Sequence, residues 1–150
     1  MQRHAGCSCG QLTLIAKGEP VRVSVCHCSA CQIRTGSAFG VQVRFPLAQV
    51  QVSGVSKGYR RRGDSGGLVD FHFCPDCGAT LYFFVDSQPK LIAIPAGNFA
   101  RDRGDDSASA FVATSVAKPH GSPLPPPTVS VYDCRRAPWV RLEGIDDVYD

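Results

Sequence analysis

Hydrophobic and polar residues alternate in three segments of the chain. Valine alternates with arginine and serine over 21–25, phenylalanine and valine alternate with glycine, glutamine and arginine over 39–45, and valine alternates with glutamine over 49–52. Successive side chains of a β-strand point to opposite faces of its sheet, so alternation places the hydrophobic residues on one face. The pattern predicts three strands, each buried on one face.

Continuous runs of β-branched and aromatic residues form a second pattern. These runs cover 12–15, 69–73, 81–85 and 91–94, and glycine, proline or aspartate bounds them. Runs of this length and composition are typical of strands that are buried on both faces. With a last short strand over 129–132, they predict a mainly all-β protein built from two or more antiparallel sheets.

Helix is predicted to be a minor component. Only 29–34 has helical character, and it ends before Gly36, a residue that favours the left-handed conformation found after helices. The segment 101–109 is charged and contains glycine, and 118–128 carries five prolines. Both are therefore predicted to be surface loops.

Length and charge narrow the function classes. A chain of 150 residues has the size of one domain, so we predict a single domain over residues 1–150. Its net charge of +3 is small and spread along the chain, which gives no reason to expect a nucleic acid or a membrane surface as partner, and nothing indicates an oligomeric state.

The hydropathy of the chain indicates where in the cell the protein is expected. Residues 1–7 contain no hydrophobic signal-peptide core, and the longest apolar run, 79–85, is far shorter than the roughly 20 residues of a membrane-spanning helix. We therefore expect a soluble protein of the cytoplasm.

Eight cysteines are the most informative feature of the composition. Cytosolic proteins keep their thiols reduced and rarely use structural disulfides, so metal binding is the usual reason for so many cysteines. Seven of them are only one to three residues from the next cysteine in a cluster, whereas disulfide frameworks usually join cysteines that are distant in sequence. The spacing favours zinc over disulfides.

Two of the cysteine clusters combine into one predicted site. Residues 74–78 read Cys-Pro-Asp-Cys-Gly, a zinc knuckle in which two thiolates bind one ion, and residues 7–10 read Cys-Ser-Cys-Gly. Cysteines at positions i and i+2 of an extended segment face the same way and can share an ion. We predict a closed structural zinc site with four ligands: Cys7, Cys9, Cys74 and Cys77.

The third cluster offers only three thiols. Residues 26–31 read Cys-His-Cys-Ser-Ala-Cys. Three protein ligands and one open position are the arrangement of catalytic zinc, which can bind a substrate thiol as thiolate or polarise a small carbonyl. We therefore predict that Cys26, Cys28 and Cys31 form a catalytic zinc site.

Alternatives exist for this second site. His27 could be a fourth ligand, although in an extended chain it faces away from its neighbours Cys26 and Cys28. Cys134 could close the site, but we expect it to be a buried or half-buried thiol near the last strand. The cluster could also be purely structural.

The arginine-rich segment 60–67 reads Arg-Arg-Arg-Gly-Asp-Ser-Gly-Gly, which is typical of the tip of a β-hairpin. Such a run of charges is usually solvated. The alternative is that these arginines hold the carboxylates of a substrate.

Several motifs together resemble one family. The motifs are the cysteine clusters at 6–10, 26–31 and 73–78, Thr-Gly-Ser-Ala-Phe at 35–39, Gly-Asp-Ser-Gly at 63–66, Ile-Pro-Ala-Gly-Asn-Phe at 94–99 and Arg-Ala-Pro-Trp-Val at 136–140. In these motifs the chain resembles the glutathione-dependent formaldehyde-activating enzyme family, which includes centromere protein V. The resemblance extends over almost the whole chain.

The resemblance implies a β-tent fold of curved antiparallel sheets with two zinc ions per chain. It also implies an enzyme that condenses glutathione with formaldehyde to S-(hydroxymethyl)glutathione. This enzyme is classed as a carbon–sulfur lyase because the reverse reaction breaks the carbon–sulfur bond. In this family the thiolate of glutathione attacks the carbonyl carbon near the zinc of the three-cysteine site.

We therefore hypothesise a zinc-dependent carbon–sulfur lyase-type enzyme whose partners are a small thiol, such as glutathione, and a small aldehyde. The alternative is a zinc-stabilised binding module without turnover, acting on a protein or nucleic acid. A third hypothesis is redox regulation through the clustered thiols, which zinc loss on oxidation would reveal.

Overall fold

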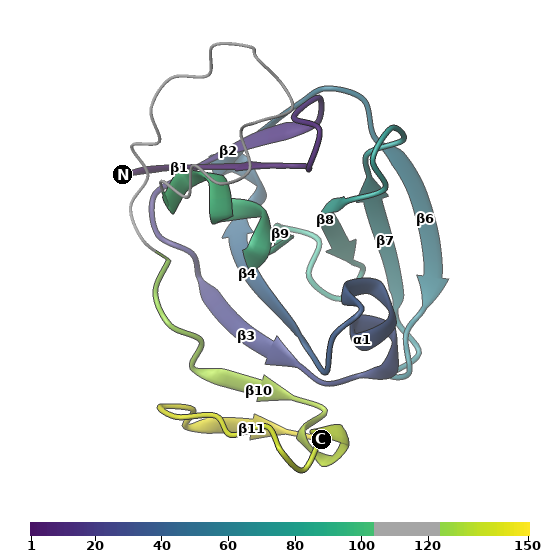
Figure 1. Cartoon of the computed structure of the whole chain (residues 1–150), viewed down its shortest axis with the longest axis vertical. Helices are drawn as coiled ribbons and strands as arrows, with labels where there is room; N and C mark the ends of the chain where they lie inside the picture. The colour runs from purple at the N-terminus through teal and green to yellow at the C-terminus, as the bar shows by residue number, and fades with distance from the viewer. Residues whose placement is uncertain (104–123) are drawn as a thin grey trace.

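The computed structural model describes residues 1–103 and 124–150 of the chain (Figure 1). The strands are β1 (Gln2–Gly6), β2 (Thr13–Lys17), β3 (Arg22–Cys26), β4 (Gly40–Pro46), β5 (Val50–Ser53), β6 (Lys57–Arg62), β7 (Leu68–Phe73), β8 (Thr80–Val85), β9 (Leu91–Pro95), β10 (Val129–Val131) and β11 (Asp147–Tyr149). The helical elements are α1 (Ser29–Thr35) and the 3-10 turns η1 (Leu47–Gln49), η2 (Ala96–Arg103) and η4 (Asp133–Arg135).

The strands form two sheets. The smaller has the order β1-β2-β5, and the larger has the order β11-β10-β3-β4-β9-β8-β7-β6. The larger sheet curves, so that β3 and β4 lie on one side of the molecule and β6 and β7 on the other, with α1 between them (Figure 1). The predicted mainly β fold of curved sheets with little helix is confirmed.

One part of the sheet prediction is wrong. We expected antiparallel pairing throughout, but β10 runs parallel to β3 and also parallel to β11. Parallel neighbours need a long connection between them. More than 100 residues of chain separate β3 from β10, which allows a parallel pairing. Hydrophobic alternation shows which face of each strand is buried, but it does not show the direction in which one strand runs relative to another.

The core lies between the two sheets and contains two of the clustered cysteines. Its fully buried side chains come from the turns after β1 and β7, from β2 and from the strands β4, β8 and β9 of the large sheet: Leu12, Leu14, Val43, Phe45, Cys74, Leu81, Ile92 and Ile94. Cys7 is 1% exposed and belongs to the same core. Burying a side chain of this size contributes about 1.5–3 kcal/mol relative to leaving it exposed.

Burial differs from the predicted pattern in two strands. The segment 12–15 was expected to be buried on both faces, but only Leu12 and Leu14 are buried, while Thr13 and Ile15 are half-buried. The opposite holds for β4, which was expected to have one polar face. Its Gln42 and Arg44 are also buried, since β4 is central in the large sheet between β3 and β9.

Strands at the sheet edges were missed by the hydrophobic pattern. The prediction contained no β1, β6 or β11, and it assigned residues 60–67 to a hairpin tip. In the structure, β6 continues to Arg62 and the tip is confined to 63–67. The outer strands β6 and β11 are largely exposed, so backbone pairing defines them and hydrophobic burial does not.

The predicted helix and loops fall close to the observed elements. Helix α1 spans Ser29–Thr35, and Gly36 follows it in the left-handed conformation, donating its N–H to the carbonyls of Gln32 and Ile33. Residues 101–103 of the predicted loop 101–109 belong to η2, and 104–109 lie outside the described residues. Of the predicted loop 118–128, residues 124–128 have no regular secondary structure and 118–123 lie outside the described residues.

Gly54, at the end of β5, packs so closely that no side chain fits. Its φ of 98° is in the left-handed region, and a Cβ atom there would lie 2.0 Å from the carbonyl oxygen of Gln11. We predict that Gly54→Ala lowers the free energy of unfolding by about 3 kcal/mol or more, since it adds a backbone clash to a strained conformation. Denaturant unfolding measures this change.

The matched control is Gly36→Ala. Gly36 also has a positive φ, of 61°, but no atom lies within 4 Å of the added Cβ. Its expected cost is about 1 kcal/mol, from conformation alone. Equal losses for the two variants would show that the close approach at Gly54 is not what constrains this turn.

Candidate metal centres

Four thiols from two distant turns form the first group. Cys7 and Cys9 lie in the turn between β1 and β2, and Cys74 and Cys77 lie in the turn between β7 and β8. Their sulfur atoms all lie within 4.8 Å of one another, with 3.5 Å from Cys7 to Cys9 and 3.6 Å from Cys9 to Cys74. The structure thus brings together all four residues that the spacing predicted for one site.

Backbone and side-chain N–H groups point at these sulfurs. The N–H of Leu12 donates to Cys7 Sγ at 3.3 Å, and the amide Nε2 of Gln11 donates to Cys74 Sγ at 3.2 Å. The same amide group exchanges two hydrogen bonds with the backbone of Val55, so it links the cluster to the segment between β5 and β6. Hydrogen bonds of this kind stabilise thiolates and orient metal ligands.

The sequence did not predict that Gln11 contacts the first group of thiols. Its position two residues after Cys9 places it in the same turn, but no spacing relates it to Cys74, which is 63 residues away. Only the tertiary fold brings the two together.

The first group fits a tetrahedral metal ion. Zinc–sulfur bonds of about 2.3 Å place the sulfurs of a tetrahedral site about 3.8 Å apart, close to the separations found here. All eight cysteines lie in the described residues and are free thiols. The group could therefore hold a metal ion as a closed site of four sulfurs.

Three thiols form the second group, and all come from one short segment. Cys26 ends β3, Cys28 is the N-cap of α1, and Cys31 lies in the first turn of α1. Their sulfurs lie within 4.8 Å of one another, and Cys26 and Cys31 are only 4% and 8% exposed. This group also contains the three residues that the sequence predicted.

The helix start favours a negative charge on Cys28. Its sulfur accepts a hydrogen bond from the backbone N–H of Cys31 at 3.4 Å, as N-cap side chains do. Hydrogen bonds from the Cys26 and Cys31 thiols lower the pKa of Cys28 to about 2. The bond with Cys28, followed by that with Cys31 and by burial, raises the pKa of Cys26. The arrangement thus favours the thiolate form of Cys28, and a soft cation could bind the three sulfurs in place of their protons.

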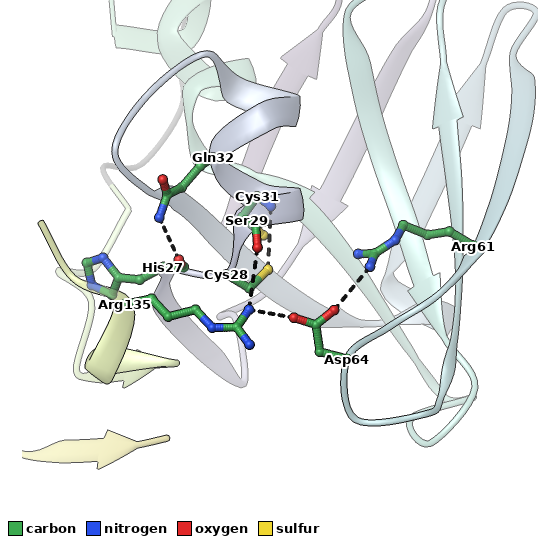
Figure 2. Close-up of polar contacts among 8 residues, drawn as sticks. All are labelled: His27, Cys28, Ser29, Cys31, Gln32, Arg61, Asp64 and Arg135. Carbon is green, nitrogen blue, oxygen red and sulfur yellow. Dashed lines mark hydrogen bonds and ion pairs between the residues drawn. The ribbon is translucent and has the colours of Figure 1, made fainter.

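No fourth protein ligand joins this group among the described residues. His27 points away from the thiols (Figure 2); its ring packs edge-on against Phe39, and its Nε2 lies 4.0 Å from Asp133 Oδ1. Burial lowers the pKa of His27. The expectation that His27 faces away from its neighbours agrees with this position.

Cys134 does not close the second group either. It lies in η4, just after β10, and it is exposed. The prediction of a buried or half-buried thiol is therefore wrong, because the chain turns outward at η4 and leaves this side chain at the surface. Its backbone N–H donates to Asp150 Oδ1 at 2.7 Å, which ties η4 to the C-terminal residue.

A chain of ion pairs lies beside Cys28 (Figure 2). Arg135 of η4 binds Asp64 Oδ2 at 2.5 Å and lies 3.5 Å from Ser29 Oγ at the start of α1. The other oxygen of Asp64 lies 3.5 Å from Arg61 Nη2. These contacts connect the β6–β7 hairpin with the C-terminal part of the chain at the edge of the three-thiol group.

The hairpin arginines have partners within the protein. Arg60 pairs with Asp70 at 2.6 Å, and Arg62 donates to the carbonyl of Gly66 at 2.7 Å. Both contacts support the interpretation of the hairpin as a structural feature with a charged, solvated tip. Arg135 had no signal in the sequence, since 71 residues separate it from Asp64.

A cleft of about 550 Å³ opens next to the second group. Its walls come from α1, the start of β4, the start of β8 and the junction of β9 with η2: Arg34, Thr35, Phe39, Gly40, Val41, Ala79, Thr80, Pro95, Ala96, Gly97 and Asn98. None of the clustered cysteines lines it. Its link to the thiols is Gly40, where an added Cβ would lie 3.4 Å from Cys31 Cβ.

The fold is mainly β, and its two groups of thiols could each hold a metal ion, as in metal-binding proteins with cysteine ligands. The family model of the glutathione-dependent formaldehyde-activating enzyme matches residues 2–114, and the chain belongs to this family. The resemblance predicted from the motifs is thereby confirmed.

One solved structure that the chain resembles is a Rhodobacter sphaeroides protein from a structural-genomics programme. It is 19% identical, covers 63% of this chain and 85% of its own, and aligns with a TM-score of 0.51, which shows a shared fold alone. No curated protein matches the chain significantly. Within residues 1–103 and 124–150, no helix has the length and apolar character required to cross a membrane.

The two groups predict different outcomes for cysteine loss. In Cys74→Ser the first group loses a buried ligand, and the chain is expected to unfold or lose most of its stability. A structural zinc contributes on the order of 10 kcal/mol, comparable with the whole stability of a small domain. Thermal unfolding and metal content measure the effect, with the exposed thiol variant Cys134→Ser as the control. Unchanged thermal stability in Cys74→Ser would contradict a structural role.

Cys28→Ser is expected to leave the fold intact and to remove metal from the second group alone. All three thiols lie within six residues of chain, so the tertiary fold does not depend on their joint coordination. Circular dichroism and metal analysis of the purified variant test this expectation. Full retention of metal at the second group would rule out the three-thiol site.

Proposed function

We propose that this protein is a zinc-dependent carbon–sulfur lyase-type enzyme that acts on the adduct of a small thiol with a small aldehyde. The observation that carries the proposal is the three-thiol group, which has no fourth protein ligand among the described residues. Membership of the glutathione-dependent formaldehyde-activating family supports glutathione and formaldehyde as the substrates.

Two zinc ions per chain are part of the proposal. Cys7, Cys9, Cys74 and Cys77 would hold the structural ion, and Cys26, Cys28 and Cys31 would hold the catalytic one. When bound at the second group, zinc supplies Lewis-acid chemistry that favours a substrate thiolate or polarises a carbonyl. The soft thiol donors of both groups fit zinc better than magnesium or calcium, which prefer oxygen.

The reaction needs a thiolate and an aldehyde held together. In the proposed direction the sulfur of glutathione attacks the carbonyl carbon of formaldehyde, a carbon–sulfur bond forms, and the carbonyl oxygen takes up a proton to give the hydroxymethyl group. Cys28 would serve as a ligand of the zinc ion, and Arg135, which Asp64 holds in place, contributes a positive charge near it. Fixed charges of this kind stabilise a reacting centre without rearranging during the reaction.

The proposal includes a cytoplasmic location and a single functional domain. Eight free thiols suit a compartment that keeps cysteines reduced. Residues 129–131 of the C-terminal part pair with β3, the strand that ends at Cys26, so this part of the chain packs directly beside the proposed site.

The first test is exchange NMR on glutathione with formaldehyde. The adduct forms spontaneously, so acceleration of the exchange is the informative quantity. The zinc-loaded protein is expected to accelerate exchange at least about tenfold over the uncatalysed reaction. The Cys28→Ser variant, with its first group intact, should give the uncatalysed rate.

The absence of acceleration by the zinc-loaded wild-type protein would contradict the proposed activity. It would favour the alternative of a zinc-stabilised binding module. Equal acceleration by wild type and Cys28→Ser would instead contradict the assignment of the reaction to the three-thiol group.

A further inference from the structure

Arg34, in the last turn of α1, has buried nitrogens without partners. Its Nε and Nη2 atoms are inaccessible to solvent and make no hydrogen bond with the residues that the structure describes. Buried polar groups are nearly always paired, and an unpaired charged group costs more than a neutral one. Two unpaired donors on one guanidinium therefore point to an acceptor that the described residues do not supply.

Aromatic rings hold this guanidinium in place. Its Cζ lies 5.6 Å from the ring centre of Phe83 and 6.0 Å from that of Phe71, which form a cross-strand pair on β7 and β8. Cation–π contacts of this kind orient an arginine but accept none of the N–H groups at its edge. The rings thus hold the side chain in place without accepting a hydrogen bond from its N–H groups.

Arg34 lines the cleft beside the three-thiol group. Two other polar side chains of the cleft are engaged with the backbone: Thr35 Oγ1 donates to the carbonyl of Cys31 at 2.8 Å, and Asn98 Nδ2 donates to the carbonyls of Thr80 and Leu81. None of the described residues that line the cleft is acidic. A ligand that enters it meets one cationic group and mostly apolar walls.

The end of Arg34 lies next to Cys31. An added Cβ at Gly40 would be 3.0 Å from Arg34 Nη2 and 3.4 Å from Cys31 Cβ, so the glycine leaves a small gap that both residues border. Arg34 therefore connects the cleft to the three-thiol group in space.

We propose that Arg34 binds the carboxylate of the thiol substrate in this cleft. The identification of the ligand as a thiol rests on the proposed function, whereas its carboxylate is inferred from Arg34 alone. A guanidinium edge presents two parallel N–H groups that match the two oxygens of a carboxylate. The lining contains one cation, which neutralises a single negative charge.

Two thiols that differ in one end group test the proposal on the zinc-loaded protein. 3-Mercaptopropionate carries a carboxylate, and 3-mercapto-1-propanol carries a hydroxyl group in its place. We expect the first to shift the Nε–Hε resonance of Arg34 in the ¹H–¹⁵N spectrum and the second to leave it unchanged. Arg34→Gln should weaken binding of 3-mercaptopropionate about tenfold or more, and Arg34→Lys should weaken it less.

The matched control is Arg60→Gln. Arg60 is exposed on the outer strand β6 and pairs with Asp70, so its loss removes the same charge away from the cleft. Binding of 3-mercaptopropionate by this variant should equal that of the wild type. If Arg34→Gln does not fold, the comparison of the two thiols on wild-type protein and on Arg34→Lys still decides the question.

The outcomes separate this inference from the proposed function. Equal binding of the two thiols, with no shift of the Arg34 resonance, would overturn the role of Arg34 even if the enzyme accelerates glutathione exchange. Carboxylate-dependent binding that Arg34→Gln abolishes would support that role, even if no acceleration of the exchange is found.

Discussion

Four thiols from two distant turns converge on one point of the fold. Cys7 and Cys74 are buried in the core between the two sheets, and they join the start of the small sheet to the β7–β8 end of the large one. Contacts between the thiols alone contribute little to the free energy of folding, whereas a shared metal ion would add its binding free energy to folding. The close approach at Gly54 and the hydrogen bonds of Gln11 hold β5 against the same turn, so the site and its surroundings stabilise one another.

The second thiol group has a different physical basis. Its three cysteines lie between the end of β3 and the first turn of α1, so coordination there closes only a short loop and adds little to the stability of the fold. Charged and polar groups surround it instead. A backbone N–H at the start of α1 donates to Cys28, the Arg135–Asp64 ion pair lies at one edge, and Arg34 lines the cleft. These features support the proposed catalytic role of the three-thiol group.

The sequence predicted the parts of the molecule that local patterns encode. Short spacing identified the members of both thiol groups, and hydrophobic runs identified β8 and β9, because these features depend on neighbours along the chain. The edge strand β6 was missed, since its Lys-Gly-Tyr-Arg-Arg-Arg sequence carries no hydrophobic pattern and only its pairing with β7 makes it a strand. Arg34, Arg135 and Gln11 were missed for a related reason. Their roles arise from contacts with residues that the curvature of the large sheet brings close, and nothing in their own sequence positions marks them.

The most direct test of the central claim, that the two thiol groups hold metal ions with different coordination, is zinc-edge X-ray absorption on the fully loaded protein together with its zinc content. We expect two zinc ions per chain and, on average, fewer than four sulfur ligands per ion, with oxygen or nitrogen completing the shell. Four sulfurs around every zinc ion, or a single ion per chain, would contradict this claim.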